Sequence, residues 1–341
     1  MSRGNESSSE RKGGGEVEQI ENYQAKLTTG GKVKNHFKRF WWAHLVAFCA
    51  GFLIIALCLV YVAMPKIAQK GIDDATLSYN SLKFMKPTLD TLTVSVDAVQ
   101  HSDSPFTPTL DAFNVSMHLV KDGVRHDKVI TQLRMPQVHA QHPDTSIIIN
   151  DQETKIVDID QVTEFCKQVL TQESITVIME GKTKLHLGAL PVNSVTYNSS
   201  ITFKALNGFK GFNITQPKID LLAEPGQPNL LGMALIPNPS VLTVELGTVV
   251  MNISTKEKGL IGNSTIENFI LKPGQNLLPI KAIVDQALVL GSVNSKTGIV
   301  NMIIVGQTAV YNGVHLPYFE AALKSHTITL PVDLQTLLSG T

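Results

Sequence analysis

Hydrophobic and polar residues alternate over most of the chain beyond residue 90. The alternation is clearest in LTVSVDA at 92–98, and it recurs at 113–119, 242–246 and 249–253. Because successive side chains of a strand point to opposite faces, a period of two is typical of strands with one face on a core and one in water. The pattern predicts an all-β fold with minor helix.

One long run departs from this alternation. Residues 41–64, WWAHLVAFCAGFLIIALCLVYVAM, contain no Asp, Glu, Lys or Arg. As a helix the run reaches roughly 36 Å, which exceeds the hydrocarbon core of a bilayer at about 30 Å. Trp41, Trp42 and Tyr61 lie near its two ends, where such rings settle at membrane interfaces. We therefore expect one transmembrane helix. A buried helix of a soluble protein and a signal peptide cleaved after Ala63 are the alternatives.

The charges around this run predict its orientation. Cytoplasmic flanks of membrane helices carry an excess of Lys and Arg. The preceding flank holds Lys26, Lys32, Lys34, Lys38 and Arg39, and the following flank holds only Lys66 and Lys70 before Asp73 and Asp74. The N-terminus is therefore expected in the cytosol, with the rest of the chain in a lumen. Residues 1–40 are rich in Gly, Ser and charge, and we expect a disordered cytosolic tail there.

Acceptor motifs for N-glycosylation agree with this orientation. Five Asn-x-Ser/Thr motifs follow the apolar run, and several place Asn between two strand residues that face the core. The predicted glycosylation sites are Asn114, Asn198, Asn213, Asn252 and Asn263. A sixth motif, at Asn5, would lie in the cytosol. This arrangement predicts a single-pass type II glycoprotein.

Helical spacing is confined to two short segments of the predicted lumenal part. Residues 158–170 carry apolar side chains at helical intervals, and Asp158 with Gln161 resembles a capping box. The second candidate is 280–290, whose β-branched residues also permit a strand. Cys166 lies on the apolar stripe of the first helix, so we interpret it as a core residue rather than a reactive thiol. The other two cysteines lie in the apolar run, so no disulfide within the lumenal part is expected.

Short motifs recur along the predicted lumenal part. Gly181-Lys182-Thr183, Gly188 and Ile201-Thr202-Phe203 are followed in the same order by Gly306-Gln307-Thr308, Gly313 and Ile328-Thr329-Leu330. Pro87-Thr88 before Leu92 parallels Pro239-Ser240 before Leu242. These markers predict two tandem β-sandwich domains, at 65–216 and 217–341.

The second copy also carries a family resemblance. It holds Asn238-Pro239-Ser240, then Gly259-Leu260-Ile261-Gly262 and Pro273-Gly274-Gln275-Asn276. This order resembles the group 2 late-embryogenesis-abundant β-sandwich. The whole layout resembles a fungal family of uncharacterised, vacuole-associated membrane proteins with tandem domains of this kind. The first copy departs from the pattern, since Lys86-Pro87-Thr88 replaces the Asn-Pro-Ser corner. The resemblance implies no catalytic residues.

The sequence offers little for catalysis, so we expect no enzyme, no cofactor and no metal. Gly181-Lys182-Thr183 resembles the end of a phosphate loop, but Thr176 stands where the first glycine is required. His139 and His142 lack an acidic partner in a zinc-protease pattern, and the pair is expected in solvent. His101, His118 and His186 are expected on polar strand faces.

Composition narrows the expected partners. Lysine plus arginine and aspartate plus glutamate number 29 each, and aromatic residues are 6% of the chain. Because the chain has no net charge and few aromatic residues, we expect no nucleic acid partner. The apolar run predicts a membrane-tethered binding or structural protein, and the resemblance implies the vacuole or another endomembrane compartment, with the cell surface as the alternative location. Its partners are then the membrane and other lumenal proteins or lipid. A second hypothesis is binding or transfer of an apolar ligand such as a lipid, and a third is a hydrolase.

Overall fold

The computed structural model describes residues 29–224, 226–333 and 335, with side chains from residue 38 onward. The chain forms two compact units, Met1–Cys58 and Leu59–Thr341. Most of the predicted disordered tail lies outside the described residues. Its last part, 29–40, is helical rather than disordered up to a kink at Phe40.

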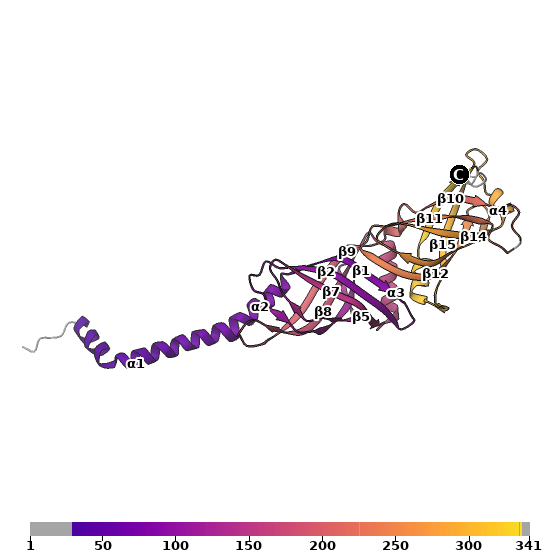
Figure 1. Cartoon of the computed structure of the whole chain (residues 1–341). Helices are drawn as coiled ribbons and strands as arrows, with labels where there is room; N and C mark the ends of the chain where they lie inside the picture. The colour runs from indigo at the N-terminus through magenta and orange to yellow at the C-terminus, as the bar shows by residue number, and fades with distance from the viewer. Residues whose placement is uncertain (1–28, 225, 334, 336–341) are drawn as a thin grey trace, which may run out of the picture. The chain divides into compact units, whose positions relative to one another are not determined.

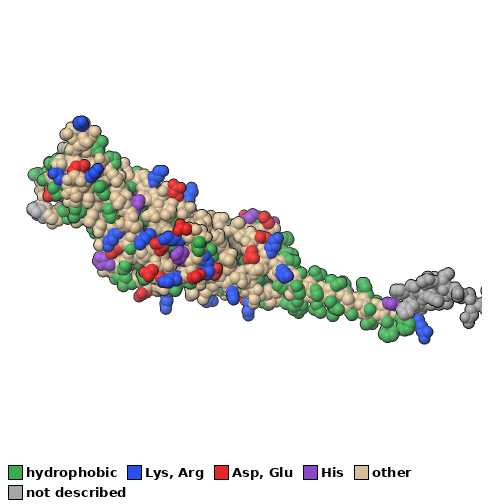
Figure 2. Space-filling model, turned by 180° about the vertical axis from the view of Figure 1, so that it is seen from behind, with side chains coloured by type: hydrophobic (Ala, Val, Ile, Leu, Met, Phe, Trp, Pro, Cys, Tyr) green, Lys and Arg blue, Asp and Glu red, His purple; other side chains and the backbone are tan. Residues whose placement is uncertain are grey.

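The first unit contributes α1 (Thr29–Cys58), which has a non-helical residue at Phe40. The helix continues in the second unit as a π-helical stretch, Leu59–Ala63, and α2 (Met64–Asp73). Among the described residues, the one helix long and apolar enough to cross a membrane is the stretch Lys38–Asp73, and none of its most apolar window is buried. Figure 2 shows hydrophobic side chains along this helix. The predicted span, 41–64, lies inside it.

The second unit contains two β-sheets, shown with their helices in Figure 1. The larger sheet holds β1 (Thr76–Met85), β2 (Thr91–His101), β7 (Asp144–Lys155), β10 (Asn213–Ile219), β11 (Leu230–Asn238), β12 (Leu242–Thr255), β13 (Gly259–Leu271), β14 (Gly274–Val284), β15 (Ile299–Tyr311), β16 (Val314–His315) and β17 (Thr327–Asp333). The smaller sheet holds β3 (Thr109–Leu110), β4 (Phe113–Lys121), β5 (Val124–Met135), β6 (Val138–His139), β8 (Ser174–His186) and β9 (Asn193–Lys204). The helices are α3 (Ile159–Thr171), a 3₁₀ turn (Asn207–Phe209), α4 (Gln286–Leu290) and α5 (Pro317–Lys324). The predicted all-β class with minor helix is confirmed.

One strand pair connects the N-terminal and C-terminal halves of the second unit. β1 runs parallel to β12, with Leu82 opposite Leu242 and Phe84 opposite Val244, whereas the other pairings of these strands are antiparallel. Apolar residues of both halves belong to one continuous core cluster. The predicted boundary at 216/217 falls inside β10. The division into two domains stays a prediction, and the two segments share hydrogen bonds and core across the junction, which we call the seam.

Strand pairing follows the predicted repeat in part. The order β5-β4-β8-β9 in the smaller sheet matches β13-β12-β15-β17 in the larger one. Gly181 and Gly306 both lie in the third strand of these series, β8 and β15. Leu92 and Leu242 do not correspond in this way, because Leu92 lies in β2 and Leu242 in β12.

The two helix predictions had different outcomes. Asp158 caps α3, because its carboxylate accepts hydrogen bonds from the backbone amides of Asp160 and Gln161, so this helix is confirmed. The candidate at 280–290 is wrong over 280–284, where β14 pairs with β11 and β13. Only α4 is helical, and it starts where Asp285 accepts a hydrogen bond from the Leu288 amide.

The Asn-Pro-Ser corner turns the chain between β11 and β12. Asn238 is buried, and its Nδ2 donates to the Leu242 carbonyl at 2.8 Å while its Oδ1 accepts from the Ser240 amide at 2.9 Å. Ser240 Oγ accepts from the Leu242 amide at 3.2 Å. Pro239 interrupts strand pairing at this corner, and the Asn238 and Ser240 side chains satisfy the backbone groups of the turn instead. This corner positions Leu242 at the start of β12, directly opposite β1.

Candidate functional site

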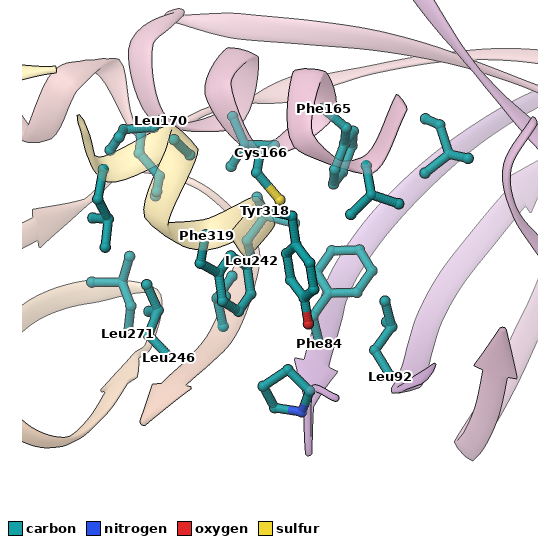
Figure 3. Close-up of a pocket in the computed structure, with 18 of the residues that line it drawn as sticks. Phe84, Leu92, Phe165, Cys166, Leu170, Leu242, Leu246, Leu271, Tyr318 and Phe319 are labelled. Carbon is teal, nitrogen blue, oxygen red and sulfur yellow. The ribbon is translucent and has the colours of Figure 1, made fainter. Parts of the chain in front are cut away.

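The candidate site is an apolar cavity at the seam, with a volume of about 80 Å³. Its walls come from α3 and β1 of the N-terminal half and from β12, β13 and α5 of the C-terminal half (Figure 3). The residues labelled in the figure are Phe84, Leu92, Phe165, Cys166, Leu170, Leu242, Leu246, Leu271, Tyr318 and Phe319. No Asp, Glu, Lys, Arg or His side chain is among the described residues that line it.

Helix α3 supplies one wall because its apolar side chains fall on a single face. Val162, Phe165, Val169 and Leu170 are buried, and the Phe165 ring meets Phe84 of β1 edge to face with centroids 6.0 Å apart. The start of the helix is held by the Asp158 cap, and Lys128 Nζ lies 2.9 Å from an Asp158 oxygen. The capping carboxylate has a pKa below its usual value, first because of the hydrogen bond from Lys128. A rigid α3 therefore presents a fixed apolar surface to the seam.

Helix α5 supplies the opposite wall. Pro317 occupies its first turn, where a missing amide hydrogen costs nothing. The helix packs against α3 and β15, and close approach to β15 requires Gly306, since a β-carbon there would lie 2.5 Å from Leu323 Cβ. Tyr318 and Ala322, four residues apart, share one face of the helix and line the cavity together with Leu323.

Two polar contacts cross the seam beside the cavity. The Tyr318 hydroxyl donates to the Thr88 carbonyl at 2.8 Å, although 230 residues separate the two in sequence. Glu245 Oε2 accepts from the Lys86 amide at 2.8 Å, where Lys86 has a positive φ of 48°. The Lys-Pro-Thr corner of the N-terminal half is therefore held by residues of the C-terminal half. This explains how a corner without Asn and Ser is stabilised.

The two ionisable groups of the cavity are neutral at physiological pH. Cys166 is half-buried overall, and Figure 3 shows its sulfur turned into the cavity near Tyr318. Burial raises the pKa of the Cys166 thiol to about 12. Burial also raises the pKa of Tyr318, and the neighbouring Cys166 adds to this. Since a thiol nucleophile must be ionised, the geometry agrees with a core role for Cys166.

Smaller apolar cavities continue the first one in both directions. A cavity of about 20 Å³ shares Phe84, Met117 and Phe165 with it, on the side of the N-terminal half. Another of about 30 Å³ shares Leu170 and Leu323, on the side of the C-terminal half. A row of three apolar spaces thus runs through the interior. Each is smaller than the roughly 150 Å³ cavity that admits benzene in a protein core.

The predicted glycosylation sites lie on strands and do not converge on this cavity. Asn114, Asn198, Asn213 and Asn263 are exposed, and Asn252 is half-buried. Asn252 in β12 lies directly opposite Asn263 in β13, so two of the motifs are cross-strand neighbours. The side chains are accessible as the alternation required, while their modification stays a prediction.

The positions of most histidines agree with the predictions for them. His139 and His142 are exposed, with hydrogen bonds to Thr109 at 2.9 Å and to the Ser102 carbonyl at 3.2 Å. The prediction is wrong for His118, which is buried at 4% exposure and lies 3.0 Å from the His126 carbonyl. The register of β4 shifts on both sides of His118, which breaks the alternation.

Two further histidines lie beside carboxylates. His101 lies 2.8 Å from Asp144, and His186 lies 3.1 Å from Asp111. Within the described residues, no group of three or more His, Cys, Asp or Glu side chains gathers in a way that could hold a metal ion.

Sequence reasoning missed α5 and with it the cavity. The segment beginning at Pro317 contains Tyr318, Phe319, Ala322 and Leu323 at helical spacing, which is a helix signal with proline in the first turn. Its eight residues are short for recognition by periodicity. The Tyr318 contact to Thr88 leaves no trace in local sequence.

Comparison with family profiles finds a match over part of the chain. The profile of the family described as "Protein of unknown function (DUF3712)" matches residues 128–253, from β5 into β12, and so includes α3 and the start of the seam. No curated protein matches the chain.

Among solved structures, the chain is similar to a bacterial adhesin from Mobiluncus mulieris containing intramolecular disulfide, isopeptide and ester bond cross-links. The identity is 11%, the match covers 75% of this chain and 97% of the adhesin chain, and the TM-score is 0.20.

The buried thiol predicts a specific pH dependence of stability. The Cys166 pKa is about 12 in the folded protein against an ordinary value of 9.0. Unfolding therefore releases a proton from Cys166 above pH 9. The contribution of Cys166 to the free energy of unfolding is constant below pH 9, and it falls as the pH rises from 9 toward 12. Denaturant titrations from pH 8 to 11 should show a steeper loss of stability for the wild type than for Cys166→Ala. Parallel profiles would contradict a buried, neutral thiol, and Cys58→Ala serves as the control.

Proposed function

We propose that the chain is a non-catalytic, single-pass type II membrane protein whose β-rich unit acts in binding or structural organisation in a lumen. The observation that carries this proposal is the helix Lys38–Asp73, whose apolar side chains are exposed. Phe48, Phe52 and Ile55 are each more than half exposed, which is unfavourable in water and favourable in lipid. The uncharged stretch 41–64 is long enough to cross the hydrocarbon core.

The proposed orientation rests on charge and on the glycosylation motifs. Basic residues crowd the N-terminal flank of the helix, which favours a cytosolic N-terminus. All five predicted sites follow the helix, and four of their asparagines are exposed on strands. A glycan at each would extend into solvent without disturbing the core.

The non-catalytic assignment is supported by the chemistry of the seam cavity. Its polar groups are committed to structure: the Tyr318 hydroxyl donates to Thr88, and Thr131 Oγ1 donates to the Lys155 carbonyl at 2.8 Å. The high pKa of Cys166 leaves a thiol rather than a thiolate at neutral pH. General acid–base or nucleophilic catalysis needs a group poised near the working pH, and these groups are far from it.

The proposed location is the vacuole or another endomembrane compartment. It follows from the resemblance to the fungal vacuole-associated family with group 2 late-embryogenesis-abundant domains, and the cell surface is the alternative. The Asn238-Pro239-Ser240 corner, whose side chains hold the turn as described, supports this relationship.

Topology is the direct test of the proposed function. We expect protease added to sealed native-host vesicles to remove an N-terminal epitope tag and to spare a C-terminal tag until detergent is added. Glycosidase treatment should lower the apparent mass, and Asn→Gln changes at the five sites should remove that shift. Digestion of the C-terminal tag in sealed vesicles would reject the orientation.

A second candidate function is binding of an apolar ligand such as a lipid chain. The row of three spaces through the seam favours it, because neighbouring spaces share lining residues and are lined mainly by apolar side chains. At about 80 Å³ the central space is too small for an acyl chain at rest. Binding would require α5 to move away from α3. The short α5 is held by side-chain packing against α3 and β15 and has no strand pairing of its own, so it can move without breaking a sheet.

A cavity-filling substitution tests this candidate. Ala322 lines the cavity and is 4% exposed, while Ala321 on the same helix is half-buried and lies outside the lining. With a photoreactive fatty acid in native-host cells, we expect cross-links on the peptides that contain Cys166 or Tyr318. Ala322→Leu should reduce them and Ala321→Leu should not. Cross-links confined to residues 41–64 would rule out an internal ligand site.

A further inference from the structure

The membrane-proximal end of the second unit carries two exposed apolar side chains close to the end of the membrane-spanning run. Ile67 on α2 is 46% exposed, although Ile72 on the same helix is buried in the core. Phe106, in the loop between β2 and β3, is 42% exposed. A cavity of about 50 Å³ lies between α2 and this loop, and Met64, Ile67 and Phe106 all line it. The three residues are therefore neighbours.

Helix α2 is held against the smaller sheet by a side chain that hydrogen-bonds to the backbone of an edge strand. The Gln69 amide donates through Nε2 to the Thr196 carbonyl at 2.7 Å and accepts through Oε1 from the Thr196 amide at 2.9 Å. This two-way pairing satisfies the edge of β9 as a neighbouring strand would. Burial of Ile72 adds an apolar contact. The position of α2 relative to the loop is thus set within the second unit.

The loop that carries Phe106 is also held in place. The Ser102 amide donates to the Pro143 carbonyl at 2.9 Å, and the Phe106 amide donates to Ser104 Oγ at 3.3 Å. Ser104 Oγ is also the side-chain atom nearest Gly71 of α2, 3.7 Å from where a β-carbon would stand. The loop therefore rests against the helix with the Phe106 ring left partly in the open.

Chain continuity brings this end to the bilayer surface however the first unit is oriented. Met64 is the last residue of the uncharged run, and at about 1.5 Å per residue Ile67 follows it within roughly 5 Å. Phe106 borders the same cavity as Met64. Apolar side chains such as Phe and Leu are favoured where they reach the boundary between headgroups and acyl chains. Lys66 and Lys70 are exposed beside them and can extend to lipid headgroups.

We propose that Ile67 and Phe106, here called the anchor face, insert into the same bilayer that the preceding helix crosses. The proposal rests on the membrane-spanning function proposed above. Exposed Asp73, Asp74 and Asp103 offset the two lysines, so net charge does not select acidic lipid. The occupant is a lipid surface, and zwitterionic phosphatidylcholine is sufficient. A docked face holds the β-rich unit at the membrane by a second contact in addition to the helix.

A tryptophan reporter tests the proposal in the full chain. The only tryptophans are Trp41 and Trp42, and changing both to Phe gives a silent background. Phe106→Trp is then reconstituted into phosphatidylcholine liposomes with and without brominated acyl chains. We expect a blue-shifted emission that brominated lipid quenches, and the same for Ile67→Trp. Val314 is the matched control because it is also 42% exposed and belongs to β16 of the C-terminal half, so Val314→Trp should be unquenched.

The outcomes separate this proposal from the function on which it rests. Liposome flotation comes first, and a chain that does not float with the lipid overturns both. If the chain floats but the emission of Phe106→Trp and Ile67→Trp is no different from that of Val314→Trp, the anchor face is wrong. The proposed membrane-spanning helix then stands. Quenching of both reporters above the control supports the anchor face.

Discussion

The parallel pairing of β1 with β12 is the constraint on which the rest of the second unit depends. It joins strands about 160 residues apart and places the partly buried Phe84 beside the buried Val244. Once the pair forms, α3 and α5 must meet across it, and Tyr318 reaches the Thr88 carbonyl. Backbone groups buried at such a junction are satisfied only while the pair holds. The cavity lies where α3 and α5 cover this strand pair.

If the helix Lys38–Asp73 crosses a membrane as proposed, this arrangement links the membrane mechanically to the C-terminal half. Residues beyond Leu59 form a single compact unit, so a partner that binds the C-terminal half is mechanically connected to α2 through the seam. Gln69 and Ile72 join α2 to the N-terminal half, and the Lys86 and Thr88 contacts join that half to the C-terminal one. A presenting or organising role benefits from such rigidity, whereas ligand uptake would have to loosen it at α5.

Local sequence determined much of the fold and little of the seam. Alternation identified β2, β4 and β12, and the Asp158 cap identified α3, because strands and capped helices are specified by near neighbours. The strand at 280–284 was mistaken for helix, since β-branched residues suit both and pairing with β11 decided the outcome. His118 was misplaced by a register shift in β4. The seam and the Tyr318 contact depend on residues far apart in sequence, which no local pattern records.

Cooperative unfolding tests the central claim most directly. If the seam makes one body of residues 59–341, calorimetry of the full chain in detergent should show a single transition with equal calorimetric and van't Hoff enthalpies. Seam amides such as those of Leu82 and Phe84 should exchange hydrogen only by the same global opening. Two separate transitions, with early exchange at the seam, would contradict the account and show two independent domains joined by a weak contact.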